Sequence, residues 1–361
     1  MALALQRNEI WNEITTAFES KFGWLGKQFA ENMLISTCSW NIQQYSAPEY
    51  RIRRHTLLFW QAGFLKSQML SKTYDILGDQ LCTIMSDVSI ATLRGSVEAH
   101  RFVSPYTLKR PFSICTEFGQ LISGDQEVIQ KLLNVLEEGI VTVSLAKISQ
   151  LDPGQVDEVE KKYGITFIDN TTFTYRTNWV LFAATYNNKF LVDSALESRF
   201  ALMLPKKKLD NELVKHVNRA PPFALSQEAV DSLRFEVLMD KPIETMIKLP
   251  DECYEFPITM RDAGMICSTL LCKKWWGLKP TKEEAVALAQ EYSKNSDEIW
   301  KSAEDKVLDV LLSGGGRSVD ELVGETGLHI RTVYKALNNL RTVKDISTNS
   351  KGEEVIVHKL K

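Results

Sequence analysis

Long hydrophobic runs are missing from this sequence. Nowhere do apolar residues extend over the roughly 18 consecutive positions that a membrane-spanning helix needs. The first residues, MALALQRNEIWNEI, lack the basic segment followed by an apolar segment that marks a secretion signal. We therefore expect an intracellular protein, cytoplasmic or associated with the nucleoid, that makes no contact with membranes.

Cysteine is also scarce, and the six cysteines are scattered through hydrophobic surroundings. None belongs to a C-x-x-C pair, and no histidine stands near one at the spacing of metal ligands. The pattern gives no indication of a zinc module and predicts buried free thiols.

Neither sign of charge is in large excess, since the formal net charge is only −3. This excludes a uniformly basic nucleic-acid-binding surface, although basic clusters at 51–55, 206–208 and in the last segment leave room for a local patch. With 361 residues, 44% hydrophobic and 25% charged, the chain has the composition of an ordinary globular protein of two or three domains.

Short apolar runs alternate with amphipathic segments between about 55 and 205. The runs at 56–60, 112–115 and 178–185 predict buried strands, and the segments 67–77 and 126–138 predict helices. This order predicts an α/β domain with a mostly parallel sheet. We divide the chain into a helical segment at 1–50, an α/β core at 51–205, a helical domain at 206–300 and a C-terminal domain at 301–361.

The stretch WQAGFLKS (60–67), between a predicted strand and a predicted helix, matches part of a G-x-x-G-x-G-K-S phosphate-binding loop. Such a loop wraps backbone N–H groups around a phosphate at a helix N-terminus, while Lys reaches the phosphates and Ser holds Mg²⁺. Gly63, Lys66 and Ser67 stand at the required positions, but Trp60 and Leu65 replace two glycines.

Three further polar residues follow predicted strands or helices in an order that suits ATP hydrolysis. Thr116 and Glu117 follow the second strand, where a Walker B motif has Asp-Glu, so the general base is present but a metal-binding carboxylate is not. Asn187 lies just beyond the third strand, and Arg199 follows a predicted short helix. An amide there can orient the attacking water, and an arginine can stabilise the transferring charge.

These motifs resemble those of the AAA+ ATPases and, within them, the minichromosome maintenance (MCM) helicases. The similar segments are CTEFGQL, KLLNVLEEGIVTVSLAKI, LFAATYNN, ALESRFALML and PITMRDAGMICSTLLCKKWWGLKPTKEEAVALAQEY. The resemblance covers about residues 55–300, and a winged-helix tail such as 303–361 also occurs in that family. It implies an AAA+ P-loop core with a parallel sheet, a helical lid and a C-terminal winged helix.

The resemblance also implies a function and assigns roles to residues. It implies a hexameric, ring-forming, ATP-dependent DNA helicase or replication-initiation motor that binds ATP and Mg²⁺, acts on single-stranded or duplex DNA and binds a replication protein. Gly63, Lys66 and Ser67 would bind phosphate and Mg²⁺, Glu117 would be the base, and Asn187 would be sensor 1. The remaining roles would fall to Arg199 as arginine finger in trans, Arg261 as sensor 2 of the lid, and Lys147 as the hairpin lysine that touches the DNA backbone. A solvated strand lysine is the alternative for Lys147.

The sequence departs from the family in several places. The large N-terminal DNA-binding region is missing, the segment between the Walker motifs is short, and residues 149–177 form an unusual acidic extension that we expect to point away from DNA or to meet a protein. Leu65 and Thr116 keep open a catalytically degenerate DNA-binding or assembly factor. A superfamily 3 type viral or plasmid replication helicase is another alternative, although its lid would not explain PITMRDAGM.

In the tail, two helices around a glycine-centred turn and two strands predict a helix-turn-helix with a wing. The second helix would present polar residues to DNA, namely His329, Arg331, Thr332, Lys335 and Asn338. Protein docking is the alternative, because winged helices serve both purposes. For Trp275 and Trp276 we expect burial in the lid rather than stacking on bases.

Overall fold

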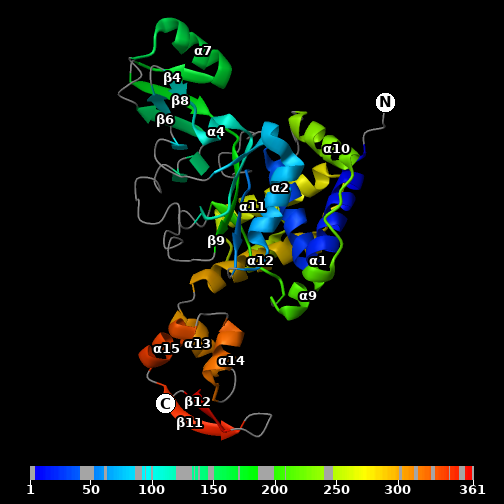
Figure 1. The fold of residues 1–361 in the computed structure, drawn as a ribbon, viewed down its shortest axis with the longest axis vertical. Coiled ribbons are helices and arrows are strands. Elements are labelled where there is room, and N and C mark those ends of the chain that lie inside the picture. The colour runs from blue at the N-terminus through cyan, green and yellow to red at the C-terminus, as the bar shows by residue number, and fades with distance from the viewer. Residues whose placement is uncertain are drawn as a thin grey trace. The chain divides into compact units, whose positions relative to one another are not determined.

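The computed structural model divides the chain into two units, Met1–Tyr292 and Ser293–Lys361 (Figure 1). It describes residues 5–40, 53–60, 63–85, 92–93, 95–98, 101–118, 132–133, 135–136, 139–144, 150–169, 171–185, 199–207, 209–239, 247–300, 303–312, 316–326, 330–340, 342–348 and 354–359. We consider each unit by itself.

The first unit is built on a parallel sheet of five strands. Their order is β10 (Phe200–Met203), β1 (His55–Phe59), β9 (Val180–Thr185), β5 (Phe112–Cys115) and β2 (Cys82–Ile84). Most residues of the four strands other than β2 are buried, as expected for a parallel sheet covered on both faces. The predicted α/β fold with a parallel sheet is confirmed, and the three predicted strands are β1, β5 and β9.

Helices cover one face of this sheet, as Figure 1 shows for α1 (Arg7–Ser39), α2 (Lys66–Leu81) and α10 (Gln227–Leu238). Alternate strand side chains, among them Leu58, Ile114 and Phe182, join these helices in one hydrophobic core. The predicted N-terminal helical segment is therefore part of the core. It is one helix with a kink at Gly23, whose φ of 64° lies in the left-handed region.

The region after the sheet is helical, as predicted. It contains α9 (Asn211–Arg219), α10, the short 3₁₀ helix η2 (Asp251–Glu255), α11 (Met260–Trp275) and α12 (Lys282–Trp300). The expected burial of Trp275 and Trp276 is confirmed, because they are 8% and 0% exposed. The Trp276 indole donates a hydrogen bond of 2.9 Å to the carbonyl oxygen of Leu34 on α1.

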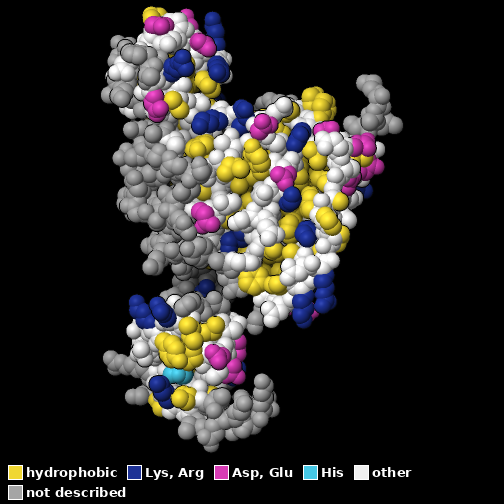
Figure 2. Space-filling view, viewed as in Figure 1, with side chains coloured by type: hydrophobic (Ala, Val, Ile, Leu, Met, Phe, Trp, Pro, Cys, Tyr) yellow, Lys and Arg dark blue, Asp and Glu magenta, His cyan; other side chains and the backbone are white. Residues whose placement is uncertain are grey.

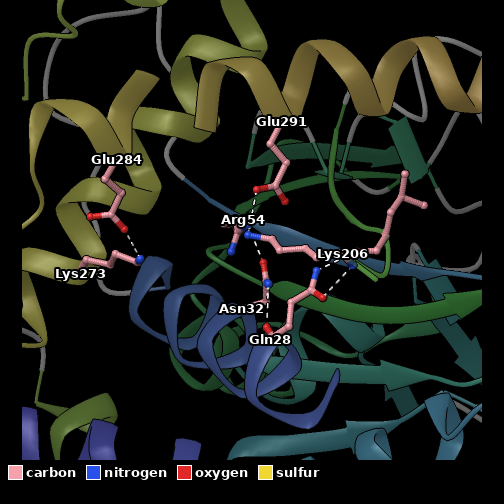
Figure 3. Close-up of polar contacts among 8 residues, drawn as sticks. Gln28, Asn32, Arg54, Lys206, Lys273, Glu284 and Glu291 are labelled. Carbon is pink, nitrogen blue, oxygen red and sulfur yellow. Dashed lines mark hydrogen bonds and ion pairs between the residues drawn. The ribbon is translucent and has the colours of Figure 1, made fainter. Parts of the chain in front are cut away.

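Polar contacts fasten the first half of α12 to the rest of the unit (Figure 3). Lys206, just after β10, forms an ion pair of 3.0 Å with Glu291, and Lys273 of α11 pairs with Glu284. The buried Arg54, just before β1, donates a hydrogen bond of 2.7 Å to the side chain of Asn32 on α1. These contacts link α1, α11, α12 and the ends of two strands.

An insertion outside the main sheet holds two smaller sheets. These are the hairpin of β3 (Ser96–Glu98) and β4 (Arg101–Val103), and an antiparallel sheet of β6 (Ile140–Ser144), β8 (Thr172–Arg176) and β7 (Ile165–Phe167). Helix α4 (Tyr106–Lys109) follows the hairpin, and α7 (Pro153–Tyr163) precedes β7. The unusual extension at 149–177 thus supplies one helix and two strands of the insertion.

The second unit contains the two helices and two strands predicted for the tail, α14 (Val319–Thr326), α15 (Ile330–Asn339), β11 (Val343–Thr348) and β12 (Glu354–Lys359). A further helix, α13 (Ala303–Leu312), precedes them and was not predicted. The two strands pair antiparallel, and Arg317 adds an isolated bridge to His358. A small core that includes Val307, Leu322 and Val333 holds the three helices together.

All six cysteines are free and buried, which confirms that prediction. Within the part of the chain that the structure describes, no helix combines the length and the apolar character needed to cross a bilayer.

His55 lies fully buried at the start of β1. Its Nδ1 accepts a hydrogen bond of 3.1 Å from the backbone N–H of Leu181, and its Nε2 lies 3.3 Å from the carbonyl oxygen of Leu136. Burial and, to a smaller extent, the charge of Arg53 together lower the pKa of His55 to about 3, although the contact with Leu136 opposes the fall. The imidazole is therefore neutral in the folded protein at neutral pH.

This burial predicts a pH-dependent stability. The unfolded state binds the proton near pH 6.5 and the folded state only near pH 3, so the His55 contribution is complete above pH 6.5 and is lost as the pH falls. We expect the free energy of unfolding to drop by about 2 kcal/mol between pH 7 and pH 5 because of this group. Urea denaturation of the wild type and of His55→Asn, which keeps an acceptor for Leu181, measures this. If the free energy of unfolding fell equally with pH in both proteins, the pH dependence could not be assigned to His55.

Candidate phosphate-binding site

The loop between β1 and α2 has positive φ at two of its described residues, Gly63 and Leu65. Gly63 has a φ of 84° and nothing within 4 Å of where a Cβ would stand. Leu65 has a φ of 64° and a ψ of −8°, and in the described part of the chain it is the only residue other than glycine with positive φ. Leu65 thus adopts the left-handed conformation at the position where the expected motif has glycine. Leu65 therefore has the positive φ that glycine adopts most readily, although it carries a side chain.

Lys66 begins α2 and is buried, with 8% of its surface exposed. Its Nζ donates a hydrogen bond of 2.5 Å to the carbonyl oxygen of Trp60 and lies 5.3 Å from the centre of the Trp60 ring. The Trp60 indole in turn donates a bond of 2.7 Å to the carbonyl oxygen of Phe64. Trp60 stands where the motif has a glycine, and its carbonyl oxygen and indole join the start of the loop to Lys66 and Phe64 by hydrogen bonds. We call the loop closed in this sense.

Glu117 shares this site with Lys66. Burial lowers the pKa of Lys66 to about 8, and the negative charge of Glu117 opposes that fall. Glu117 is exposed and stands two residues beyond the end of β5, while Thr116 beside it is half-buried. The structure therefore brings together the two residues that sequence reasoning assigned to phosphate binding and to the general base.

Two predicted residues, Asn187 and Lys147, lie outside the described residues. Strand β9 ends at Thr185, which pairs with Phe59 at the end of β1. Asn187 is two residues beyond this point in the sequence. Strand β6 ends at Ser144, three residues before Lys147. Both roles stay predictions.

Arg199 and Lys66 lie at opposite ends of the parallel strands. Arg199 is at the end where the strands begin, and Lys66 follows the end where they finish. It immediately precedes β10, whose first residue, Phe200, pairs with His55 at the beginning of β1. Lys66 follows the other end of β1. Since a strand rises about 3.3 Å per residue, the five residues from His55 to Trp60 separate the two ends by ~16 Å. The fold thus keeps Arg199 away from the phosphate loop of its own chain.

Two further predicted residues occupy helix N-termini. Ser67 is exposed in the first turn of α2, next to Lys66. Arg261 is the second residue of α11, which begins with a capping box between Thr259 and Asp262. The start of α11 lies near Arg54 and Tyr292, because Arg54 and Asp262 both act on the pKa of the Tyr292 hydroxyl, which burial raises. The role of Arg261 as sensor 2 stays a prediction.

On the second unit, Arg331, Lys335 and Asn338 are exposed along α15, and Thr332 is half-buried. The outward orientation predicted for the first three is confirmed. His329 lies outside the described residues.

Metal ligands at the loop are few. Over the described ranges, no three His, Cys, Asp or Glu side chains come together as a metal site would require. This agrees with Thr116 in place of an acid. A nucleotide-bound Mg²⁺ nevertheless fits, because such an ion is held by one or two protein ligands together with phosphate oxygens and water. Ser67 is placed to be one of these ligands.

Comparison with protein-family models gives no match, and neither does comparison with curated proteins. The function therefore has to be argued from the geometry of the site.

The conformation of Leu65 makes a prediction about loop stability. A left-handed conformation costs an L-residue roughly 1–2 kcal/mol, whereas the half-buried Leu65 side chain recovers a similar amount by packing against the core. We expect Leu65→Gly to change the free energy of unfolding by less than about 1 kcal/mol. Leu65→Val, which puts a β-branched residue at positive φ, should destabilise by about 2 kcal/mol. Urea denaturation of both variants measures these changes, and a glycine variant that is less stable than the valine variant would refute the conformation.

Proposed function

We propose that this protein is an ATPase of the AAA+ type, resembling the MCM helicases, that acts on DNA as a ring-forming helicase or replication-initiation motor. The observation that carries the proposal is that Lys66, at the N-terminus of α2, and Glu117 both follow the carboxyl ends of parallel strands of one sheet, where the charge of Glu117 acts on Lys66. Ligands of such sheets bind in the crevice outside these ends. A lysine at a helix N-terminus facing a carboxylate is the arrangement needed to hold a phosphate beside a general base.

The backbone and the charge of the loop both support the binding of a nucleoside triphosphate. Gly63 and Leu65 both have positive φ, and α2 adds the partial positive charge of its N-terminus. Bound ATP would supply the phosphoryl group, with Mg²⁺ neutralising its charge. Lys66 would exchange the Trp60 carbonyl for a phosphate oxygen, and Glu117 would take the proton of the attacking water.

Arg199 supports a site shared between subunits. The sheet keeps it at the opposite end of the strands from Lys66, so it cannot stabilise charge at its own loop. In a ring, the same residue can reach the loop of a neighbouring subunit and act as an arginine finger. This is the basis for proposing a homo-oligomer, and a hexamer follows from the family resemblance.

The second unit supports DNA as the partner because its charges are segregated. Residues 330–361 contain seven Lys or Arg and three Asp or Glu, whereas 303–329 contain two and six. The basic segment includes α15 and the β11–β12 hairpin, with Arg331 and Lys335 exposed. We infer that this unit is a winged helix that places α15 against duplex DNA.

A second candidate is a DNA-binding or assembly factor that keeps the fold without turnover. The closed loop favours it, because Lys66 is bonded to Trp60 and Trp60 to Phe64. In this case ATP would neither bind nor be hydrolysed, and the basic face of the second unit would carry the activity.

Steady-state release of phosphate from ATP, with and without DNA, separates the two candidates. We expect DNA-stimulated turnover that falls at least 100-fold in both Lys66→Ala and Glu117→Gln. Glu117→Gln should still bind ATP, because only the base is removed. Lys72→Ala, which removes a half-buried lysine that pairs with Asp75 on the same helix, is the control and should retain activity. Absence of both turnover and ATP binding in the wild type would refute the ATPase and favour the second candidate.

The shared site predicts complementation between subunits. Arg199→Ala should abolish turnover, since removing an arginine finger costs about 10³-fold or more. An equimolar mixture of Arg199→Ala and Lys66→Ala should regain activity, because some interfaces then combine an intact loop with an intact arginine. Each variant measured alone at the same total concentration is the control. A mixture as inactive as its components would contradict action in trans.

A further inference from the structure

A pocket lies in the insertion, between β4 and α7. It has a volume of about 300 Å³, and its walls come from Arg101 and Phe102 on one side and Glu158, Lys162 and Tyr163 on the other. Figure 1 shows α7 and β4 together at one end of the first unit, away from α1 and α2. The pocket is therefore distinct from the phosphate loop.

Two aromatic rings form part of the wall. The centres of Phe102 and Tyr163 are 5.9 Å apart, and Phe102 also meets Phe173 of β8 edge to face at 5.5 Å. Both Phe102 and Tyr163 are only half-buried, so part of each ring remains available to a ligand. Half-exposed aromatic rings in a pocket offer a surface on which a planar base stacks.

Charged groups stand beside these rings. Arg101 and Lys162 are exposed on opposite walls, and the Lys162 Nζ lies 5.2 Å from the centre of the Tyr163 ring. Glu158 adds one carboxylate, which suits the exocyclic amino group of a base. Glu160 on the same helix is engaged elsewhere, since it accepts the backbone N–H of Phe167. Among the charged residues that line the pocket, Arg101 and Lys162 are basic and only Glu158 is acidic.

The volume limits the ligand. About 300 Å³ is at the lower end of small-molecule sites and accommodates one nucleotide, not a base pair within a duplex. We propose that this pocket binds single-stranded nucleic acid by holding one unstacked base against Phe102 and Tyr163, with its phosphates on Arg101 and Lys162. This deepens the proposed action on DNA and rests on it for biological meaning, but the binding itself needs no ATP.

Fluorescence anisotropy with a labelled 12-nucleotide single strand, without ATP, tests the pocket. We expect Arg101→Gln/Lys162→Gln to weaken binding at least tenfold and to reduce the salt slope by about 1.4, corresponding to two phosphate contacts. Phe102→Leu, which keeps an apolar side chain against Phe173, should weaken binding about tenfold without changing the slope. The matched control Lys161→Gln/Arg176→Gln removes two exposed charges of the same insertion outside the pocket and should change affinity less than twofold.

A control variant as weak as the pocket variant would overturn the proposal, because binding would then follow overall charge. So would an unaltered affinity in Phe102→Leu. If that variant does not fold, as judged by circular dichroism, Tyr163→Leu replaces it with the same expectation. An insertion that instead captures a protein would leave single-strand affinity equal in all variants, which also overturns the proposal.

Position-specific crosslinking separates this inference from the proposed ATPase. A strand carrying 5-iodouracil, irradiated on the wild type and on Lys66→Ala, should crosslink to a peptide containing Phe102 or Tyr163 in both proteins. Crosslinks found only elsewhere overturn the pocket even if ATP turnover is established. Crosslinks at the pocket in a protein without turnover support the pocket while refuting the ATPase.

Discussion

The position of strand β9 between β1 and β5 in the main sheet is the constraint on which the candidate site depends. Its register puts Thr185 beside Phe59 and Ala183 beside Cys115, so three strands end at one edge of the sheet. The residues that follow these ends are forced together whatever their separation in sequence, which is how Lys66 meets Glu117. The same parallel pairing, continued to β10, places Arg199 at the other edge. One sheet therefore determines which residues lie near the loop of their own chain and which lie away from it.

Burial of Lys66 explains why the closed loop is compatible with phosphate binding. Removing an ammonium group from water is costly, and the lowered pKa of Lys66 expresses that cost. The carbonyl of Trp60 offsets it only in part, because a neutral acceptor bonds a cation less strongly than an anion does. A phosphate oxygen would satisfy the same amine better. The carbonyl of Trp60 is thus a partner that an incoming phosphate could displace, so the closed loop favours the second candidate without excluding nucleotide binding.

Much of the core could be predicted from the sequence because its strands are continuous apolar runs. TLLFW, FSIC and NWVLFAAT each contain a buried strand, and no other assignment suits such runs between amphipathic helices. Strands β2 and β10 were not predicted. β2 has only three residues, one of which is exposed, so it carries too little pattern. The extension at 149–177 was recognised as unusual, but its strands β7 and β8 mix Thr with aromatics and leave one face exposed, so the apolar signal is weak.

The site was predicted in part, and what was missed is instructive. The order Lys66, Glu117 and Arg199 came from motif spacing, whereas the left-handed Leu65 contradicts the usual preference for glycine and is visible only in the backbone. The insertion pocket did leave a signal: Arg101-Phe102 and Lys162-Tyr163 each put a cation next to an aromatic residue. These pairs lie 60 residues apart, and only the packing of α7 on the β3–β4 hairpin joins them. Sequence patterns identify chemistry along a strand or helix, but the joining of two such patterns depends on tertiary packing, which neither pattern encodes by itself.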